Sequence, residues 1–445
     1  MPHTDAPYGH PQSTVWSKGS FTDRKRNVIL LLFYCNLYKE HKPVKRSTFI
    51  LSLVFVFITG ITELSAQNNN SGIRFDFCGN PVEFKYDKLN FINFTSPLTE
   101  EAIQSFYENL NKTDYQPIVN AIVSYKTLHQ LDDWLLYQLI RRTAEHISPK
   151  AENYNRYTLY KWFLLAKSGY NTTLSISGDR LLFYVQSNDS IYNIPCHFKN
   201  GSQYVCLNYH DYGTIDFEKN KFSEIAIAIP EAQKSFSYKI RQIPDFKPSD
   251  YEEKNLQFYV DQNEYEFKIK LNPEIKTMFA NYPVVDYESY FNIPLSNETY
   301  TSLIPLLKKN IKGMNIRNGV DYLMRFTRYA FLFEPDSENF GNEKRLSPEQ
   351  TLMYDHSDCE DRAALFFYLV KEIYDLPMIV LSYPKHITIA VKFDKPIGKP
   401  VYYNGIPYSI CEATPQNEDL RLGQLSYALQ KIPFEVVYAY TPHKK

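Results

Sequence analysis

The chain has 445 residues, of which 44% are apolar and 22% charged, a balance typical of a folded protein with room for about two or three domains. Its formal net charge of −1 excludes a strongly basic surface, so we expect no nucleic-acid partner. Aromatic residues reach 16%, with 37 tyrosines, which favours tyrosine-rich β structure over a sticky ligand-binding surface.

A targeting segment stands near the N-terminus. Lys45 and Arg46 precede an apolar run from Phe49 to Ile61, and the small residues Ser65 and Ala66 follow. This order predicts a signal peptide at residues 45–66, cleaved after Ala66. The run is too short to span a bilayer comfortably, so we expect an exported protein, periplasmic or secreted, without a stable membrane span in the mature chain.

Residues 1–44 precede this signal, whereas secretory signals normally begin a chain. We interpret them as an over-extended start or a disordered tail. A cytoplasmic tail followed by a signal anchor is the alternative.

The expected mature chain contains five cysteines: Cys78, Cys196, Cys206, Cys359 and Cys411. Because this number is odd, at least one thiol is free. Two of them, Cys196 and Cys206, flank Asn200-Gly201, a strong hairpin-turn signal. A cross-strand disulfide and two separate buried thiols are both consistent with this spacing.

Residues 67–215 are expected to form an N-terminal α+β domain. Ile73–Phe84 alternates like a pair of strands around Gly79-Asn80-Pro81. Leu98–Leu110 predicts a helix with Pro97 at its start and Thr95 or Ser96 as its cap. Asp132–Ile147 has the spacing of an amphipathic helix.

The stretch from Tyr154 to Asn208 is similar in order to a later one. The helix predicted at residues 160–170 lines up loosely with residues 365–374, and each is followed by a strand and by an Asn-Gly hairpin. In this alignment, positions near Asn155 and Arg180 correspond to Cys359 and His386. A duplicated unit that has lost its thiol and imidazole is one interpretation, and chance similarity between helix–hairpin pairs is the other.

Residues 216–296 predict a β-rich connecting region, in which apolar and polar residues alternate over Glu224–Ile229, Ser235–Ile243 and Glu264–Leu271. Helical spacing returns in Asn297–Lys312 and Ile316–Tyr329. We therefore expect a C-terminal domain at residues 297–445.

The start of one predicted helix carries a candidate nucleophile. Ser357-x-x-Glu360 has the form of a capping box and precedes an apolar stripe. Cys359 would then lie in the first turn, where free backbone N–H groups and the helix dipole favour a thiolate and can stabilise an oxyanion. The neighbouring carboxylates of Asp358, Glu360 and Asp361 act in the opposite direction, since they raise the pKa of a thiol.

Two further groups complete a possible triad. His386 opens the predicted strand His386–Phe393, and Glu412 ends the last strand of a hairpin. A thiol, an imidazole and a carboxylate are the parts of an activated cysteine nucleophile. Taken singly, a buried Cys, a strand His and a solvated Glu are the simpler interpretations.

A metal site is the alternative for the residues around the thiol, namely His356, Asp358, Cys359, Glu360 and Asp361. These groups are crowded onto one turn and lack the paired spacing of zinc sites, so we expect neither a metal nor a cofactor.

The segments Leu346–Leu352 and Ser357–Ala363, with His386 and Tyr408–Thr414, resemble the motifs of the bacterial transglutaminase-like cysteine peptidase superfamily over about residues 300–420. The resemblance implies a papain-like α+β core at the C-terminus. It also implies roles for three residues: Cys359 as nucleophile, His386 as general base and acid, and Glu412 as the group that orients the imidazole.

This sequence departs from the family pattern at two positions. Many members carry Asp where this chain has Glu412, and Gly often stands where it has Ser357. Spacing fixes no oxyanion donor, and Tyr354 and Gln350 are candidates.

The function implied is acyl transfer on protein or peptide amides, in which water or a second amine resolves a thioester. We favour a peptidase or amidase, because crosslinking needs an additional channel for the amine. A non-catalytic exported binding or scaffold protein that retains the fold is the alternative.

Overall fold

The computed structural model describes residues 72–85, 91–95, 97–213, 215–260, 262–333 and 344–442. The predicted signal peptide at residues 45–66 and the segment before it lie outside these ranges. Helices make up 34% and strands 27% of the structure, so the predicted α+β class is confirmed. Within the described ranges, no helix is long and apolar enough to cross a membrane.

The N-terminal half begins with a hairpin and continues with helices. Strands β1 (Gly72–Phe77) and β2 (Asn80–Lys85) pair antiparallel, as predicted. The helices are α1 (Glu100–Asn111), α2 (Gln116–Leu128), α3 (Asp133–Ile147) and α4 (Tyr154–Lys167). Thr99 caps α1 in place of the predicted Thr95 or Ser96, because its hydroxyl accepts the Ala102 N–H at 3.2 Å.

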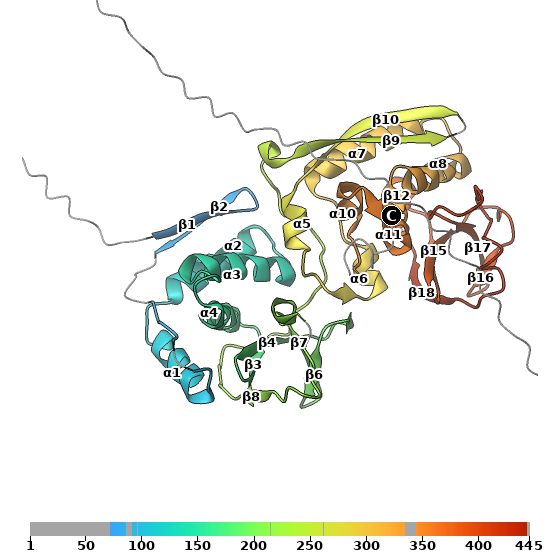
Figure 1. The fold of residues 1–445 in the computed structure, drawn as a ribbon. Coiled ribbons are helices and arrows are strands. Elements are labelled where there is room, and N and C mark those ends of the chain that lie inside the picture. The colour runs from blue at the N-terminus through green and yellow to red at the C-terminus, as the bar shows by residue number, and fades with distance from the viewer. Residues whose placement is uncertain are drawn as a thin grey trace, which may run out of the picture. The chain divides into compact units, whose positions relative to one another are not determined.

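A five-stranded antiparallel sheet follows α4 (Figure 1). Its strands are β3 (Thr172–Ser177), β4 (Arg180–Gln186), β6 (Cys196–Lys199), β7 (Ser202–Cys206) and β8 (Ser223–Ile225), in the spatial order β6-β7-β4-β3-β8. The short strand β5 (Ile191–Tyr192) pairs instead with β11 (Val284–Val285). Helix α4 packs on β3 and β4, so apolar side chains of both elements are buried together.

The cysteines near this hairpin are free thiols. Cys196 is exposed and pairs in register with Val205, whereas Cys206 is buried and pairs with Tyr184. Because adjacent residues of a strand point to opposite faces, this register keeps the two sulfur atoms apart. The structure therefore contains two separate thiols here, of which only Cys206 is buried.

The connecting region is less regular than predicted. Strands β9 (Glu252–Val260) and β10 (Asn263–Leu271) form a hairpin that packs against helices α7 (Asn297–Asn310) and α8 (Ile316–Tyr329) (Figure 1). The prediction of a strand at Ser235–Ile243 is wrong, since this segment makes one isolated bridge, between Phe236 and Ser187, and no ladder. Backbone N–H groups of this segment donate to aspartate side chains instead of to a neighbouring strand. For example, Asp189 accepts the Tyr238 N–H at 2.6 Å.

The C-terminal half supplies further helices and a second sheet. The helices are α5 (Glu274–Met278), α6 (Tyr287–Phe291), α7 (Asn297–Asn310), α8 (Ile316–Tyr329), α10 (Pro348–Met353) and α11 (Cys359–Tyr374). Helices α7 and α8 match the predicted spans closely. Two short strands, β12 (Leu332–Phe333) and β13 (His356–Ser357), pair in parallel just before α11.

The second sheet has the strand order of the first. Its strands are β14 (Met378–Tyr383), β15 (His386–Val391), β16 (Val401–Tyr403), β17 (Ile406–Cys411) and β18 (Glu435–Tyr440), in the order β16-β17-β15-β14-β18. Each sheet follows a helix, and each contains an Asn-Gly turn in which both residues have positive φ: 51° and 77° at Asn200-Gly201, 50° and 76° at Asn404-Gly405. Such turns match the twist of the strands they join.

The two faces of the second sheet bury different cores. Ile387, Ile389 and Val391 belong to the large core that includes α11. Tyr383 and Ile410 belong to a smaller core on the other face, under the irregular segment 413–434.

The described residues from 72 to 442 belong to one compact unit. The domain boundaries predicted between residues 215 and 216 and between residues 296 and 297 remain predictions.

Close backbone contact fixes segment 413–434 to the sheet. Gly423 donates its N–H to Ile410 O at 2.7 Å, and a Cβ atom at Gly423 would lie 2.2 Å from Ile397 O. Since Gly423 also has φ +79°, only glycine fits here without backbone movement.

We expect Gly423→Ala to destabilise the fold more than the matched change Gly405→Ala. Both residues have positive φ, but no atom lies within 4 Å of a Cβ at Gly405. Gly405→Ala should lower the free energy of unfolding by about 1 kcal/mol, and Gly423→Ala by a further ~1–3 kcal/mol through overpacking. Urea unfolding followed by circular dichroism measures both, and equal losses would contradict the close contact.

Candidate active site

Cys359 is the first residue of α11. The N-cap is Asp358, whose Oδ1 accepts the N–H groups of Glu360 at 2.9 Å and Asp361 at 3.1 Å. The Asp361 carboxylate in turn accepts the Asp358 N–H at 3.4 Å, which completes a capping box. The predicted box between Ser357 and Glu360 is therefore wrong by one residue, since Ser357 still belongs to β13.

This cap leaves one amide of the first turn available. Described hydrogen bonds use the N–H groups of Glu360, Asp361 and Arg362, the last donating to Asp358 O at 3.3 Å, and none of them uses the N–H of Cys359. An amide at a helix N-terminus beside a nucleophile can stabilise an oxyanion. The sequence predicted that free N–H groups of this turn can stabilise an oxyanion, and among the described hydrogen bonds the Cys359 N–H is the one left available.

The two side chains predicted as oxyanion donors lie on or next to α10. Gln350 completes the capping box of this helix, because its Oε1 accepts the Ser347 N–H at 3.1 Å. Its Nε2 is buried and makes no described hydrogen bond. Tyr354 is the C-cap residue of α10, and Lys276 lies over its ring.

The remaining acids of the motif fasten the start of α11 to other segments. Glu360 forms an ion pair with Arg345 at 2.7 Å and accepts the Tyr287 hydroxyl at 3.3 Å. Asp361 is fully buried and accepts the Leu346 N–H at 2.8 Å. These carboxylates therefore hold the helix start in place.

His386 and Glu412 lie together. His386 Nε2 is 2.7 Å from Glu412 Oε2, and the other carboxylate oxygen accepts the Thr414 N–H at 2.9 Å. Glu412 is only 1% exposed, so both of its oxygens depend on these donors. Because a carboxylate only accepts hydrogen bonds, Nε2 is the donor in this pair, and the neutral tautomer that fits this bond has no proton on Nδ1.

The side chains of His386 and Glu412 meet where the pairing between β15 and β17 ends. The ladder between β15 and β17 begins at Ile389↔Cys411. His386 and Ile387 precede this pair on β15, and Glu412 follows it on β17, so all three lie where the strands are no longer paired with each other. The twist of a sheet separates strand ends at such a point.

The thiol of Cys359 lies near this unpaired end of β15 and β17. Burial and the carboxylates of Asp358, Glu360 and Glu412 raise its pKa above that of an ordinary thiol, while the nearby backbone of Ile387 lowers it. The sulfur therefore lies against the residue that follows His386. Among the described residues no hydrogen bond joins Cys359 to the His386 ring, and the raised pKa of Cys359 favours the neutral thiol over the thiolate.

Two buried arginines that sequence reasoning missed tie this arrangement together. Arg362 of α11 donates to the carbonyls of Arg328 at 2.7 Å and Phe331 at 3.0 Å. Arg328 of α8 donates from Nε to Glu412 O at 3.2 Å and pairs with Asp419 at 2.9 Å. The helix that carries the thiol is thus linked through α8 to the residue that holds the imidazole. Arg362 adjoins the acidic motif and was open to prediction, whereas Arg328 had no local signal.

The first sheet has different groups at the corresponding positions. Tyr154 begins α4, close to the predicted position near Asn155; Arg180 begins β4, as His386 begins β15; and Asn208 follows β7. Asn208 Nδ2 donates to the Tyr154 hydroxyl at 2.8 Å, and this hydroxyl donates to Asp211 at 2.8 Å. This constellation has neither a thiol nor an imidazole at these three positions.

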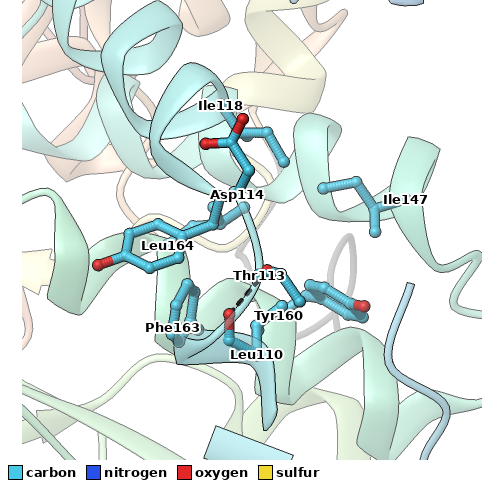
Figure 2. Close-up of a pocket in the computed structure, with 9 residues that line it drawn as sticks. Leu110, Thr113, Asp114, Ile118, Ile147, Tyr160, Phe163 and Leu164 are labelled. Atoms are coloured by element: carbon cyan, nitrogen blue, oxygen red, sulfur yellow. Dashed lines mark hydrogen bonds between the residues drawn. The ribbon is translucent and has the colours of Figure 1, made fainter. Parts of the chain in front are cut away.

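A separate hollow lies between α1, α2, α3 and α4 (Figure 2). Apolar side chains such as Ile118, Ile147 and Phe163 line it, and Thr113 donates to Leu110 O at 2.7 Å at its edge. Its volume is about 10 Å³, room for one water molecule at most. It is too small to hold a substrate.

Within the described ranges, no group of three or more His, Cys, Asp and Glu side chains is arranged to hold a metal ion. No family model, no curated protein and no solved structure matches this chain. The functional interpretation therefore depends on the geometry of the site and on the resemblance of its motifs.

We expect Cys359 to react slowly with iodoacetamide near neutral pH. Its raised pKa keeps the thiol protonated, and only the thiolate is alkylated. At pH 7 the rate should be at least about tenfold below that of the exposed Cys196, and it should still be rising at pH 9, above the ordinary thiol pKa of about 8.5. Mass spectrometry of the two cysteine peptides gives both rates; fast labelling of Cys359 at pH 6 would show a thiolate instead.

Arg362→Met should lower the free energy of unfolding by about 3 kcal/mol or more. The change leaves the buried carbonyls of Thr327, Arg328 and Phe331 without this donor, and each orphaned group costs about 1–3 kcal/mol. Arg317→Met, at an exposed position of α8, is the control and should stay within about 0.5 kcal/mol of wild type. Equal stability of the two variants in urea would refute the linking role.

Proposed function

We propose that this chain is an exported transglutaminase-like protein whose C-terminal papain-like unit catalyses thiol-dependent acyl transfer on protein or peptide amides. One observation carries the proposal: the 2.7 Å bond between His386 and Glu412 lies where the pairing of β15 and β17 ends, and the backbone of the next residue, Ile387, is close enough to the Cys359 sulfur to lower the pKa of the thiol. The order of groups is the one an activated cysteine nucleophile requires.

The first step is attack on an amide carbonyl. Since the thiol is neutral at rest, His386 Nδ1 removes its proton as the sulfur bonds to the carbonyl carbon. The Glu412 carboxylate, fixed by Thr414, then stabilises the imidazolium that forms. The Cys359 N–H stabilises the oxyanion of the tetrahedral intermediate.

The second step releases the amine. The imidazolium returns its proton to the leaving nitrogen, the C–N bond breaks, and a thioester on Cys359 remains. Water activated by the same imidazole then hydrolyses the thioester and regenerates the thiol. We favour hydrolysis over transfer to a second amine, because crosslinking needs a second binding channel for the acceptor.

The N-terminal half is, in this proposal, a degenerate copy of the catalytic unit. The support is the common strand order of the two sheets and the matching Asn-Gly turns. Tyr154, Arg180 and Asn208 occupy the positions of the triad, so the copy has no nucleophilic thiol. It serves as support for the catalytic half.

A non-catalytic binding protein is the second candidate. The observation that favours it is the environment of Cys359, where burial and three carboxylates oppose the thiolate. A protein that has lost catalysis while retaining its fold would tolerate such surroundings.

Catalysis is tested with purified mature protein and an equimolar mixture of random octapeptides, with new termini and released ammonia measured by mass spectrometry and enzymatic assay. Wild type should cleave or deamidate a subset. Cys359→Ala should abolish turnover, and His386→Ala should do nearly the same. Glu412→Gln should lower kcat by about 10²–10⁴-fold, since it keeps the shape but removes the charge that stabilises the imidazolium.

The matched controls are Cys196→Ala, which removes an exposed thiol, and Arg180→Ala, which changes the counterpart of His386 in the first sheet. Both should retain activity. Incorporation of a fluorescent primary amine into peptides by wild type would assign crosslinking. No turnover of any kind by a folded wild type would leave the binding protein as the better proposal.

A further inference from the structure

A groove of about 860 Å³ lies on the face of the second sheet that turns away from the large core. Tyr383 and Ile410 line it from the sheet. Leu425, Leu429 and Phe434 line it from the segment that covers this face. Its size is in the range of sites that bind small molecules or short peptide segments.

The groove begins beside the candidate imidazole. Tyr383 pairs in register with His386 across β14 and β15, so the two side chains share a face, and their ring centroids are 6.4 Å apart. The ring of Phe434 lies 5.6 Å from that of Tyr383. A side chain bound against these aromatic rings would belong to a residue close to the reacting amide.

One side of the groove is a sheet edge. Strand β16 is the outermost strand, and Val401 and Tyr402 from it line the groove. An edge strand presents backbone donors and acceptors that an extended peptide can pair with. Apolar rings are exposed nearby, with Tyr402 68% and Phe434 39% accessible, as expected of a surface that a ligand covers.

The groove is built before any ligand arrives. The close contact of Gly423 with Ile397 and its hydrogen bond to Ile410 fix the covering segment on the sheet. A site that does not have to be ordered on binding loses less affinity to conformational entropy.

We propose that this groove binds the substrate as an extended peptide, which pairs with the edge of β16 and places an aromatic or aliphatic side chain against Tyr383 and Phe434. The position of that side chain next to the scissile amide rests on the proposed function, whereas peptide binding does not. A lipid chain fits less well, because the sheet edge and the charged Lys399, Lys431 and Glu418 at the groove require polar partners.

The first test compares cleavage of octapeptides that differ at one position. Peptides with Phe, Tyr or Leu at a fixed position beside the cleaved bond should have a kcat/KM at least tenfold above peptides with Ala there. Phe434→Ser should reduce this ratio about tenfold. Tyr427→Ala, at an exposed residue that does not line the groove, should leave the ratio unchanged. An unchanged ratio in Phe434→Ser overturns the proposal.

The second test needs no catalysis and separates the two proposals. The Cys359→Ala protein is mixed with the same octapeptides, and retained peptides are identified by ultrafiltration and mass spectrometry. Enrichment of Phe, Tyr and Leu peptides at least fivefold over Ala peptides, lost in the double variant with Phe434→Ser, supports the groove even if wild type cleaves nothing. No enrichment overturns it, and so does sedimentation showing a dimer that Phe434→Ser dissociates, because a second copy would then be the occupant.

Discussion

The arrangement of the site depends on one buried carboxylate. Glu412 has almost no access to water, so each of its oxygens needs a hydrogen-bond donor from the protein. The Thr414 amide supplies one and the imidazole of His386 supplies the other. This requirement fixes the tautomer of the ring, and a ring with its proton on Nε2 presents an unprotonated nitrogen towards any partner on its other side.

The charge around the thiol determines which mechanism is available. A helix N-terminus alone would favour a thiolate, but burial and three nearby carboxylates outweigh it and raise the pKa of Cys359. Glu360 is partly neutralised by Arg345, and Asp358 is occupied with the helix cap. A neutral thiol requires a base at the moment of attack, so in the proposed mechanism the unprotonated nitrogen of His386 matters more than it would in a preformed thiolate–imidazolium pair.

Sequence reasoning was most reliable where a local rule determines structure. Asn404-Gly405 predicts a hairpin because both residues accept positive φ, and Ile316–Tyr329 predicts a helix from its apolar spacing. It failed where contacts between residues far apart in the sequence determine the structure. The N-cap moved from Ser357 to Asp358 because β13 extends to Ser357, and Arg328 reaches Glu412 across 84 positions of sequence. No local sequence pattern predicts such contacts.

The two sheets share a strand order but differ in the residue at the position of Glu412, where the first sheet has Asn208. Asn208 has both donors and an acceptor: it donates to Tyr154 and to Leu181 O and accepts the Phe183 N–H, so its capacity is used within the protein. A buried amide is thus satisfied without an imidazole. Glu412 can only accept, and it therefore needs the proton of His386. Exchange of an acid for an amide at this one position removes the reason for an imidazole, and with it the base that a thiol would need.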